Sequence, residues 1–300
     1  MTIAPAKNFS KKPPWLKVPF PEGDKYAWIK SRSSRLNLNT VCEEANCPNI
    51  GECWNSGTAT FMLMGDTCTR GCRFCAVKSS KYPPALDANE PSKIADTIKK
   101  MNLNYVVLTT VNRDDLPDQG ASHISRCIKA TQKTSPRLLI EMLMPDFRGE
   151  KELIQKIIHA SPAVLAHNLE TVRRLTPEVR DYRADYEQSL EVLRYLKTNC
   201  PKGYTKSSLM LGLGESRREI LQAMEDMRDA GVDFLTIGQY LQPTGKHFPV
   251  KEYVTPETFD KYKKLALGKG FSLVASSPLT RSSFHADRDF RKLRQIRVSS

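Results

Sequence analysis

The sequence predicts an α/β fold, an open (β/α)6 partial TIM barrel with an N-terminal and a C-terminal extension. Short apolar runs alternate with segments whose apolar residues recur at helical spacing, which is typical of parallel strands joined by helical crossovers. About six such units are present, fewer than the eight of a closed barrel. We expect the N-terminal extension at residues 1–59, the barrel at 60–275 and the C-terminal extension at 276–300.

The elements follow from the local patterns. The expected strands are residues 60–64, 105–110, 137–143, 163–169, 208–211, 234–241 and 271–275. The helices expected from their spacing alone include residues 90–101, 121–131, 150–159 and a segment around 186–193. A further helix, 216–230, opens with the capping box Ser216-x-x-Glu219. A last helix begins after Thr255 with proline at its first position.

Composition limits the function classes. The chain has 300 residues with 40% hydrophobic content, and no apolar run approaches a membrane span in length. The N-terminus has no apolar signal core, so we expect a cytoplasmic protein. The net charge of +13 indicates an acidic partner, which composition alone leaves open between nucleic acid, membrane surface and protein. Residues 1–19 are expected to form an extended basic arm, for which Trp15 and Phe20 are the candidate anchors; a disordered basic tail over residues 1–12 is the alternative.

Three cysteines lie close together in the segment after the first expected strand. Cys68, Cys72 and Cys75 have C-x3-C-x2-C spacing. Thiolates are soft ligands, and such groups select zinc or iron–sulfur centres. A structural zinc site is closed by four protein ligands, and no fourth ligand is evident nearby. The interpretation is a [4Fe–4S] cluster with one open iron; the alternatives are a zinc knuckle or chance clustering.

A second cysteine group lies in the N-terminal extension. Cys42, Cys47 and Cys53 have C-x4-C-x5-C spacing, again without an obvious fourth ligand nearby. A structural zinc site completed by a distant ligand is one interpretation, and a second iron–sulfur cluster is the better one beside the first group. Without a secretory signal, metal ligation suits the cysteines better than disulfides do. The remaining Cys127 and Cys200 are expected to be structural, because Cys127 lies on the apolar face of an expected helix and Cys200 precedes Pro201 at a helix end.

Polar residues follow several expected strands, at 109–115, 167–171, 212–215 and 239–244. Loops after the strands carry the sites of such barrels, so we expect one shared ligand site. Each residue also has a simpler explanation. Glu170 is suited to capping a helix, Arg183 to the solvated surface, and Gly212-x-Gly214 to a strand-to-helix turn instead of a phosphate loop.

The spacing of Cys68, Cys72 and Cys75, with Phe74 before the last cysteine, resembles the radical S-adenosylmethionine (SAM) superfamily. Both cysteine groups with their flanks resemble, more specifically, the lipoyl synthase family. That resemblance continues through residues 109–120, 167–172, 210–215, 239–244 and 281–285. The departures are mild: serine at 277, where the family often has glycine, and phenylalanine at 284, where it often has tyrosine.

The resemblance implies two [4Fe–4S] clusters and SAM as cofactors. It implies that the cysteines of the 68–75 segment hold the SAM-cleaving cluster. It implies that Cys42, Cys47 and Cys53 hold an auxiliary cluster, the sulfur donor, with Ser283 as its fourth ligand. For SAM we expect Glu170 at the ribose, Arg183 at the carboxylate and Phe74 near the adenine. Arg281 and His285 flank the serine motif, and they are expected to stabilise changing charge or to fix the loop.

The implied activity is that of a sulfurtransferase which inserts sulfur at C6 and C8 of an octanoyl chain. The chain would be linked to a lysine of a carrier, either a lipoyl domain or a glycine-cleavage H protein. The electron donor would be a ferredoxin or flavodoxin, with no nucleic acid or membrane partner. Two alternatives remain: another radical SAM enzyme, such as a tRNA methylthiotransferase, or a zinc-binding nucleic-acid module. A metal analysis that finds iron with acid-labile sulfide, and not zinc, would exclude the zinc-binding module.

Overall fold

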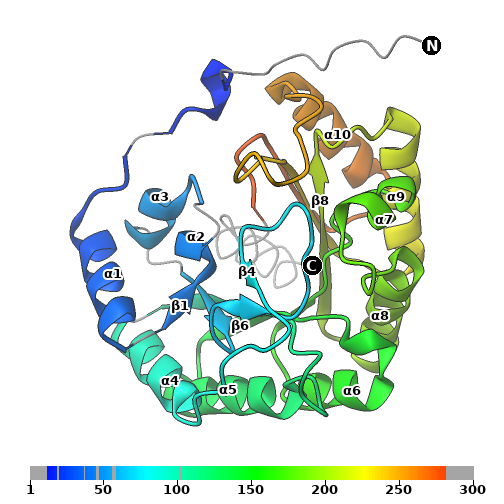
Figure 1. Cartoon of the computed structure of the whole chain (residues 1–300). Helices are drawn as coiled ribbons and strands as arrows, with labels where there is room; N and C mark the ends of the chain where they lie inside the picture. The colour runs from blue at the N-terminus through cyan, green and yellow to red at the C-terminus, as the bar shows by residue number, and fades with distance from the viewer. Residues whose placement is uncertain are drawn as a thin grey trace, which may run out of the picture.

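The computed structural model describes residues 12–18, 20–36, 38–44, 47–55, 59–101 and 103–281. It confirms the open α/β barrel (Figure 1). The main sheet has the order β1-β2-β5-β6-β7-β8-β9-β10. β1 pairs antiparallel with β2, and every other neighbouring pair is parallel. Within the described ranges β1 and β10 are the two edges of this sheet, so the barrel stays open.

The strands of the main sheet are β1 (Asn39–Thr40), β2 (Thr60–Leu63), β5 (Tyr105–Thr110), β6 (Leu139–Leu143), β7 (Val164–Ala166), β8 (Tyr204–Leu211), β9 (Phe234–Gln239) and β10 (Leu273–Ser276). A separate two-stranded sheet joins β3 (Thr67–Cys68) to β4 (Lys78–Ser79). The seven parallel strands are those expected from the apolar runs, whereas β1 was not predicted. Two residues without apolar character gave no signal for it.

The helices are α1 (Asp24–Leu36), α2 (Val41–Glu44), α3 (Ile50–Asn55), α4 (Glu90–Met101), α5 (Ala121–Thr134), α6 (Lys151–His159), α7 (Thr176–Val179), α8 (Tyr186–Asn199), α9 (Arg217–Asp229) and α10 (Pro256–Gly268). Short 3-10 turns lie at Pro14–Leu16, Phe147–Gly149 and Arg173–Leu175. The capping box of Ser216 and Glu219 is confirmed at α9. Thr255 caps α10 as predicted, by accepting from the backbone N–H of Thr258. None of the helices in the described ranges is long and apolar enough to span a membrane.

The N-terminal extension shares a core with the barrel. Helices α1 to α3 lie beside β1 at one side of the barrel (Figure 1). Trp54 is fully buried, and it belongs to the same apolar cluster as Ile29 and Phe61 of β2. In the arm, the expected anchor Phe20 is 93% exposed and Leu16 is buried instead. That prediction was wrong, because size and aromaticity alone do not tell which side of an arm meets the body.

A buried ion pair lies among the strands. Lys206 of β8 donates to both carboxylate oxygens of Glu141 in β6, at 2.8 Å each, and the Tyr105 hydroxyl donates to the same carboxylate. The polar Lys206 interrupts the apolar pattern of its strand, so the prediction began at residue 208 although β8 begins at Tyr204. Burying a charged pair is tolerated when each group is paired and hydrogen-bonded.

Candidate active site

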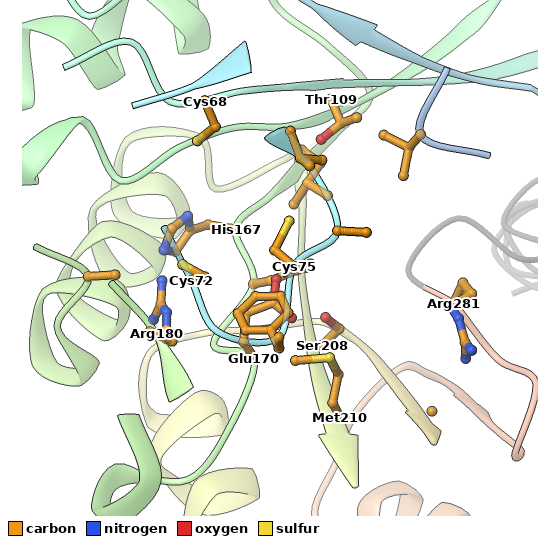
Figure 2. A pocket seen from close by; sticks show the side chains of 18 of the residues that line it. Cys68, Cys72, Cys75, Thr109, His167, Glu170, Arg180, Ser208, Met210 and Arg281 are labelled. Atoms are coloured by element: carbon orange, nitrogen blue, oxygen red, sulfur yellow. Dashed lines mark hydrogen bonds between the residues drawn. The ribbon is translucent and has the colours of Figure 1, made fainter. Parts of the chain in front are cut away.

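The cysteine segment 68–75 follows β2 at the carboxyl end of the strands. The chain leaves β2 through Met64 and Gly65, which have φ of 69° and 90°. Position 65 therefore suits glycine, because a left-handed backbone conformation costs glycine less than any other residue. Cys68 then lies in β3, and Cys72 and Cys75 follow in the loop. All three line a cavity of about 370 Å³ (Figure 2).

Residues from three of the four expected polar segments line this one cavity. Its lining includes residues from the ends of several strands and the loops after them, among them Thr109, Asn112, His167, Asn168, Glu170, Gln239 and Tyr240. Residues 212–215 are not among the lining residues. The Glu215 carboxylate accepts the backbone N–H groups of Gly212 (2.6 Å) and Leu213 (2.9 Å). These backbone N–H groups bind a carboxylate of the chain itself and are not available to a phosphate. The segment is therefore a strand-to-helix turn and not a phosphate loop.

The thiols of the 68–75 segment have a setting that suits a metal centre. Cys68 Sγ accepts the backbone N–H groups of Asn112 (3.3 Å) and Arg70 (3.4 Å), and Cys72 Sγ accepts that of Asp181 (3.2 Å). Burial raises the pKa of Cys72 to about 11 and that of Cys75 to about 12. Buried thiols of this kind are inert unless a metal deprotonates them. Three soft ligands with N–H···S donors around an open cavity therefore fit a [4Fe–4S] cluster.

Two of the three residues expected at SAM line the cavity. Phe74 lies in its wall, half-buried. Glu170 has φ of 69° and is also in the wall, where its carboxylate accepts from Asn168 Nδ2 at 3.0 Å. It does not cap a helix in the described structure. Burial raises the pKa of this carboxyl group.

The third residue, Arg183, is not among the residues that line the cavity. Its guanidinium donates to the Asp181 carboxylate (2.8 Å) and to the Thr69 carbonyl (2.7 Å). Arg180 lines the cavity instead and is buried (Figure 2). Its Nη1 donates to Ser189 Oγ at 2.9 Å, whereas its Nε has no hydrogen-bond partner within the described residues. Sequence reasoning missed Arg180, because two arginines three residues apart cannot be ranked without the fold.

His167 is a second buried side chain with a ring nitrogen that makes no hydrogen bond within the described residues. Its Nδ1 lies 3.1 Å from the Met144 carbonyl, and its Nε2 has no partner in the part of the chain that is described. Burial lowers the pKa of this imidazole to about 4. The ring is therefore neutral near pH 7, Nδ1–H donates to the carbonyl, and Nε2 remains as an acceptor.

The N-terminal cysteine group meets the C-terminal segment. Cys42 lies in α2 and Cys53 in α3. Asn49 Nδ2 donates to the Leu279 carbonyl at 2.7 Å, which joins positions 230 residues apart. Arg281 lines the cavity on the side opposite Arg180 (Figure 2). Its charge acts to lower the pKa of the Cys47 thiol, against the larger effect of burial, which raises it.

The predicted ligand Ser283 and its neighbour His285 lie outside the described residues. The description ends at Arg281, two positions before the serine, beside the second cysteine group. The three thiols of that group and this approach of the chain fit the expected auxiliary cluster. Burial raises the pKa of Cys42 to about 12, so this thiol also needs a metal to ionise.

A buried group behind the cysteine segment has a structural role. Glu90, His123 and Cys127 have ligand atoms within 4.8 Å of one another. His123 Nε2 is hydrogen-bonded to the Glu90 carboxylate (2.5 Å), which also accepts the backbone N–H of Met64 at 3.0 Å. These bonds clamp the end of β2 where the cysteine segment begins. Cys127, which was expected to be structural, is buried in the apolar core beside them.

Comparison with known proteins agrees with this geometry. A model described as the radical SAM superfamily matches residues 62–238, and one described as the N-terminal domain of lipoyl synthase matches residues 4–47. The lipoyl synthase of Myxococcus xanthus is 54% identical over 94% of this chain and 95% of its own length. The mitochondrial lipoyl synthase of Picea sitchensis is 51% identical over 97% of this chain and 77% of its own length.

Solved structures support the fold alone. The FeFe-hydrogenase maturase HydG from Carboxydothermus hydrogenoformans aligns with a TM-score of 0.58 at 12% identity, over 91% of this chain and 77% of that one. Streptococcus suis SuiB bound to S-adenosylmethionine has the same score and identity, over 84% and 60%. The zinc module and the tRNA methylthiotransferase do not account for these matches. The chain belongs to the lipoyl synthase family of the radical SAM superfamily.

Proposed function

We propose that this chain inserts two sulfur atoms, at C6 and C8, into an octanoyl group linked to a lysine of a lipoyl carrier protein. The observation that carries the proposal is the cavity itself. Its wall contains the three cysteines of the 68–75 segment, and also Val41 and Pro48, which adjoin Cys42 and Cys47 of the second group. The segment that carries the second cysteine group therefore reaches the cavity that the first group lines, which supports a reaction that joins a radical to a sulfur donor.

The cofactors are two [4Fe–4S] clusters and SAM. One cluster is assigned to the 68–75 segment, and the auxiliary one to Cys42, Cys47, Cys53 and Ser283. When bound, they supply an alkyl radical that can break an unactivated C–H bond and a sulfide that replaces the hydrogen. The protein's residues supply binding, orientation and exclusion of water. The backbone N–H groups of Asn112 and Asp181, which donate to Cys68 and Cys72, would stabilise these thiolates if they held the first cluster.

For SAM, the cavity offers groups of matching chemistry. Glu170 is proposed to accept hydrogen bonds from the ribose and Phe74 to pack near the adenine. Arg183 is the sequence-based candidate for the carboxylate, but its guanidinium is already paired. Arg180, buried in the cavity wall with an unpartnered Nε, is the better candidate for that charge-assisted contact. The neutral acceptor Nε2 of His167 is suited to a donor such as the SAM amino group.

The hydrocarbon substrate fits the apolar part of the wall. Its apolar side chains include Met62, Val111, Leu143, Met144, Leu209 and Leu241. Such a surface favours a hydrocarbon chain and disfavours water, which would compete for the polar groups of the cavity. The net charge of +13 suits an acidic carrier protein, either a lipoyl domain or a glycine-cleavage H protein. The electron donor is proposed to be a ferredoxin or flavodoxin. The cytoplasmic location stays a prediction.

Iron and sulfide analysis tests the cluster assignment. Anaerobically reconstituted protein should hold about eight irons and eight sulfides per chain. A variant with Cys68, Cys72 and Cys75 changed to alanine should keep about half of them and lose SAM cleavage. Mass spectrometry of an octanoylated peptide, after addition of SAM and reductant, should show two added sulfur atoms with the natural chain. Radical formation by the triple variant would contradict the assignment.

The Ser283 assignment has its own test. Oxygen is a harder ligand than thiolate, so a serine ligand is suited to a cluster that must open and release sulfide. Ser283→Ala should continue to form 5'-deoxyadenosine but lose lipoyl product, and Ser283→Cys should keep the cluster but slow product formation. Ser282→Ala is the matched control. Full product formation by Ser283→Ala would reject the role, and a loss confined to Ser282→Ala would assign the ligand to the neighbouring residue.

A further inference from the structure

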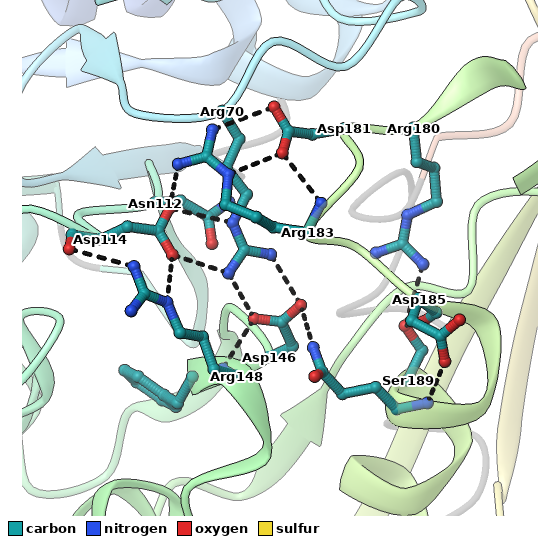
Figure 3. Close-up of polar contacts among 12 residues, drawn as sticks. Arg70, Asn112, Asp114, Asp146, Arg148, Arg180, Asp181, Arg183, Asp185 and Ser189 are labelled. Atoms are coloured by element: carbon teal, nitrogen blue, oxygen red, sulfur yellow. Dashed lines mark hydrogen bonds and ion pairs between the residues drawn. The ribbon is translucent and has the colours of Figure 1, made fainter. Parts of the chain in front are cut away.

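A buried arginine lies inside the cysteine segment, between its first two cysteines. The Arg70 side chain is 3% exposed. Its Nε and Nη2 donate to the Asp114 carboxylate at 3.0 and 2.9 Å, and its Nη1 and Nη2 donate to the Asp146 carboxylate at 2.7 and 2.8 Å (Figure 3). Asp114 follows β5 and Asp146 follows β6. One planar guanidinium thus joins the cysteine segment to two neighbouring loops, with a two-point contact to each.

The two carboxylates are held from other sides as well. Asp114 accepts from Thr69 Oγ1 (2.6 Å) and from Arg148 Nε (3.1 Å). Asp146 accepts from Gln188 Nε2 of α8 at 2.8 Å. Burial by itself would raise the pKa of Asp114, but the hydrogen bonds from Arg70 and Thr69 hold it well below its usual range. The contacts are therefore ionic, and their geometry is fixed from several elements.

The loop after β5 and the segment between α7 and α8 donate hydrogen bonds to the thiols. Asn112, two positions before Asp114, donates its backbone N–H to Cys68 Sγ at 3.3 Å. Asp181 donates its N–H to Cys72 Sγ at 3.2 Å, while its carboxylate accepts from Gly71 N at 2.8 Å. Arg183 completes the connection, because it donates to the Asp181 carboxylate (Figure 3) and to the Thr69 carbonyl. The side-chain network and the N–H···S bonds therefore share the loop after β5 and the segment around Asp181, and the loop after β6 joins the network through Asp146.

The network contains equal numbers of cationic and anionic side chains. Arg70, Arg148 and Arg183 face three aspartates, Asp114, Asp146 and Asp181. Buried ion pairs give little net stability, because desolvation offsets their attraction, although they do define geometry. Hydrogen bonds to cluster sulfurs and the exposure of the cluster set its reduction potential. Fixing the loops therefore fixes the donors that tune the cluster.

We infer that Arg70, with Asp114 and Asp146, is a positioning residue that holds the cysteine segment against the loops after β5 and β6 and thereby sets the reduction potential of the SAM-cleaving cluster. The inference rests on the proposed assignment of that cluster. It gives Arg183 a role at the Asp181 loop that differs from the SAM contact expected from the sequence. Lysine cannot replace Arg70, since an ammonium has no planar fork to bind two carboxylates at once.

The test uses Arg70→Lys, Asp114→Asn and Asp146→Asn in the reconstituted full-length enzyme. The matched control is Arg174→Lys, because Arg174 also binds a carboxylate, that of Glu219, through two nitrogens but is 53% exposed and far from the cysteines in the chain. Iron and sulfide are measured per chain, and each cluster is titrated by electron paramagnetic resonance, where SAM addition identifies the signal of the cluster that binds it. The auxiliary cluster serves as the internal reference.

We expect the three variants to keep the auxiliary cluster with an unchanged potential. The other cluster should either be lost or change its reduction equilibrium at least tenfold, about 59 mV for one electron. Full loading with unchanged potentials in the variants would overturn the inference, as would equal loss of both clusters, which would indicate a general folding role. If Arg70→Lys does not fold, the two near-isosteric asparagine variants decide. These readouts need no octanoyl substrate, so failure of the proposed sulfur insertion in the natural chain would leave the inference standing.

Discussion

The C-terminal segment lies directly against Gly238 of β9. A Cβ built at this position would lie 2.1 Å from the Thr280 carbonyl oxygen and 3.1 Å from its carbon. The same segment is bonded to β9 by Ser277 N to the Ile237 carbonyl (3.2 Å) and by Gln239 N to the Pro278 carbonyl (3.3 Å). Gly238→Ala should therefore displace the backbone of residues 277–281, because a main-chain carbonyl cannot rotate away as a side chain can.

The size of the effect follows from these distances. Ordinary contact begins at about 3.4 Å, so the carbonyl must retreat by roughly 1.3 Å. Overpacking of this kind costs about 1–3 kcal/mol. The strain falls on the segment that carries Arg281 and leads to Ser283, and on the bond from Asn49 to Leu279. We expect a loss of unfolding free energy in this range, together with a loss of most of the auxiliary cluster and the lipoyl product.

The assay compares Gly238→Ala with Gly245→Ala, a matched control because a Cβ at Gly245 meets nothing within 4 Å. Iron, sulfide, 5'-deoxyadenosine and lipoyl product are measured for both, with urea unfolding in parallel. The control should behave as the natural chain does. Gly238→Ala should still form 5'-deoxyadenosine from the cluster of the 68–75 segment. Full iron content and full product formation by Gly238→Ala would refute the reasoning.

Three further predictions follow from the structure. Lys206→Met should lower the unfolding free energy by about 3–5 kcal/mol, because it leaves Glu141 buried and uncompensated, and a second change of Glu141 to Gln should restore part of the loss in urea titrations. Arg180→Ala should weaken SAM binding in equilibrium titrations more than Arg183→Ala does; the reverse order would return the carboxylate contact to Arg183. Added salt should lower activity on an intact octanoylated carrier more than on a short octanoylated peptide, since long-range charge steering is screened, and a parallel decline would argue against a carrier-docking role for the basic charge.

The sequence was sufficient to predict the order of strands and helices in the barrel and to locate the two cysteine groups. Apolar runs and helical spacing located the seven parallel strands and the main helices, since a two-sided buried strand and an amphipathic helix leave local patterns. Caps at Ser216 and Thr255 were predictable for the same reason: the interaction lies within three residues. The two cysteine groups could be recognised because their members recur at short spacing, which is typical of the ligands of metal centres.

The arrangement of charges was decided by the tertiary structure. In the sequence, Arg70, Asp114 and Asp146 are three ordinary charged residues. Asp114 lies 44 positions after Arg70 and Asp146 lies 76 positions after it. Their pairing depends on the parallel order of β2, β5 and β6, which brings the loops after these strands to one edge of the sheet. No local pattern encodes a contact of this kind.

The same reason explains why Arg180 was missed and Arg183 was preferred. The two side chains are neighbours in the chain and have identical chemistry, but one lines the cavity and the other is bound to Asp181. Which of them faces the cavity depends on the backbone path between α7 and α8 and on the partners that each guanidinium meets there. The sequence by itself determined which residues can ligate iron and bind anions, whereas the tertiary structure decided which of those anion-binding groups remain available, because availability depends on partners brought together from distant parts of the chain.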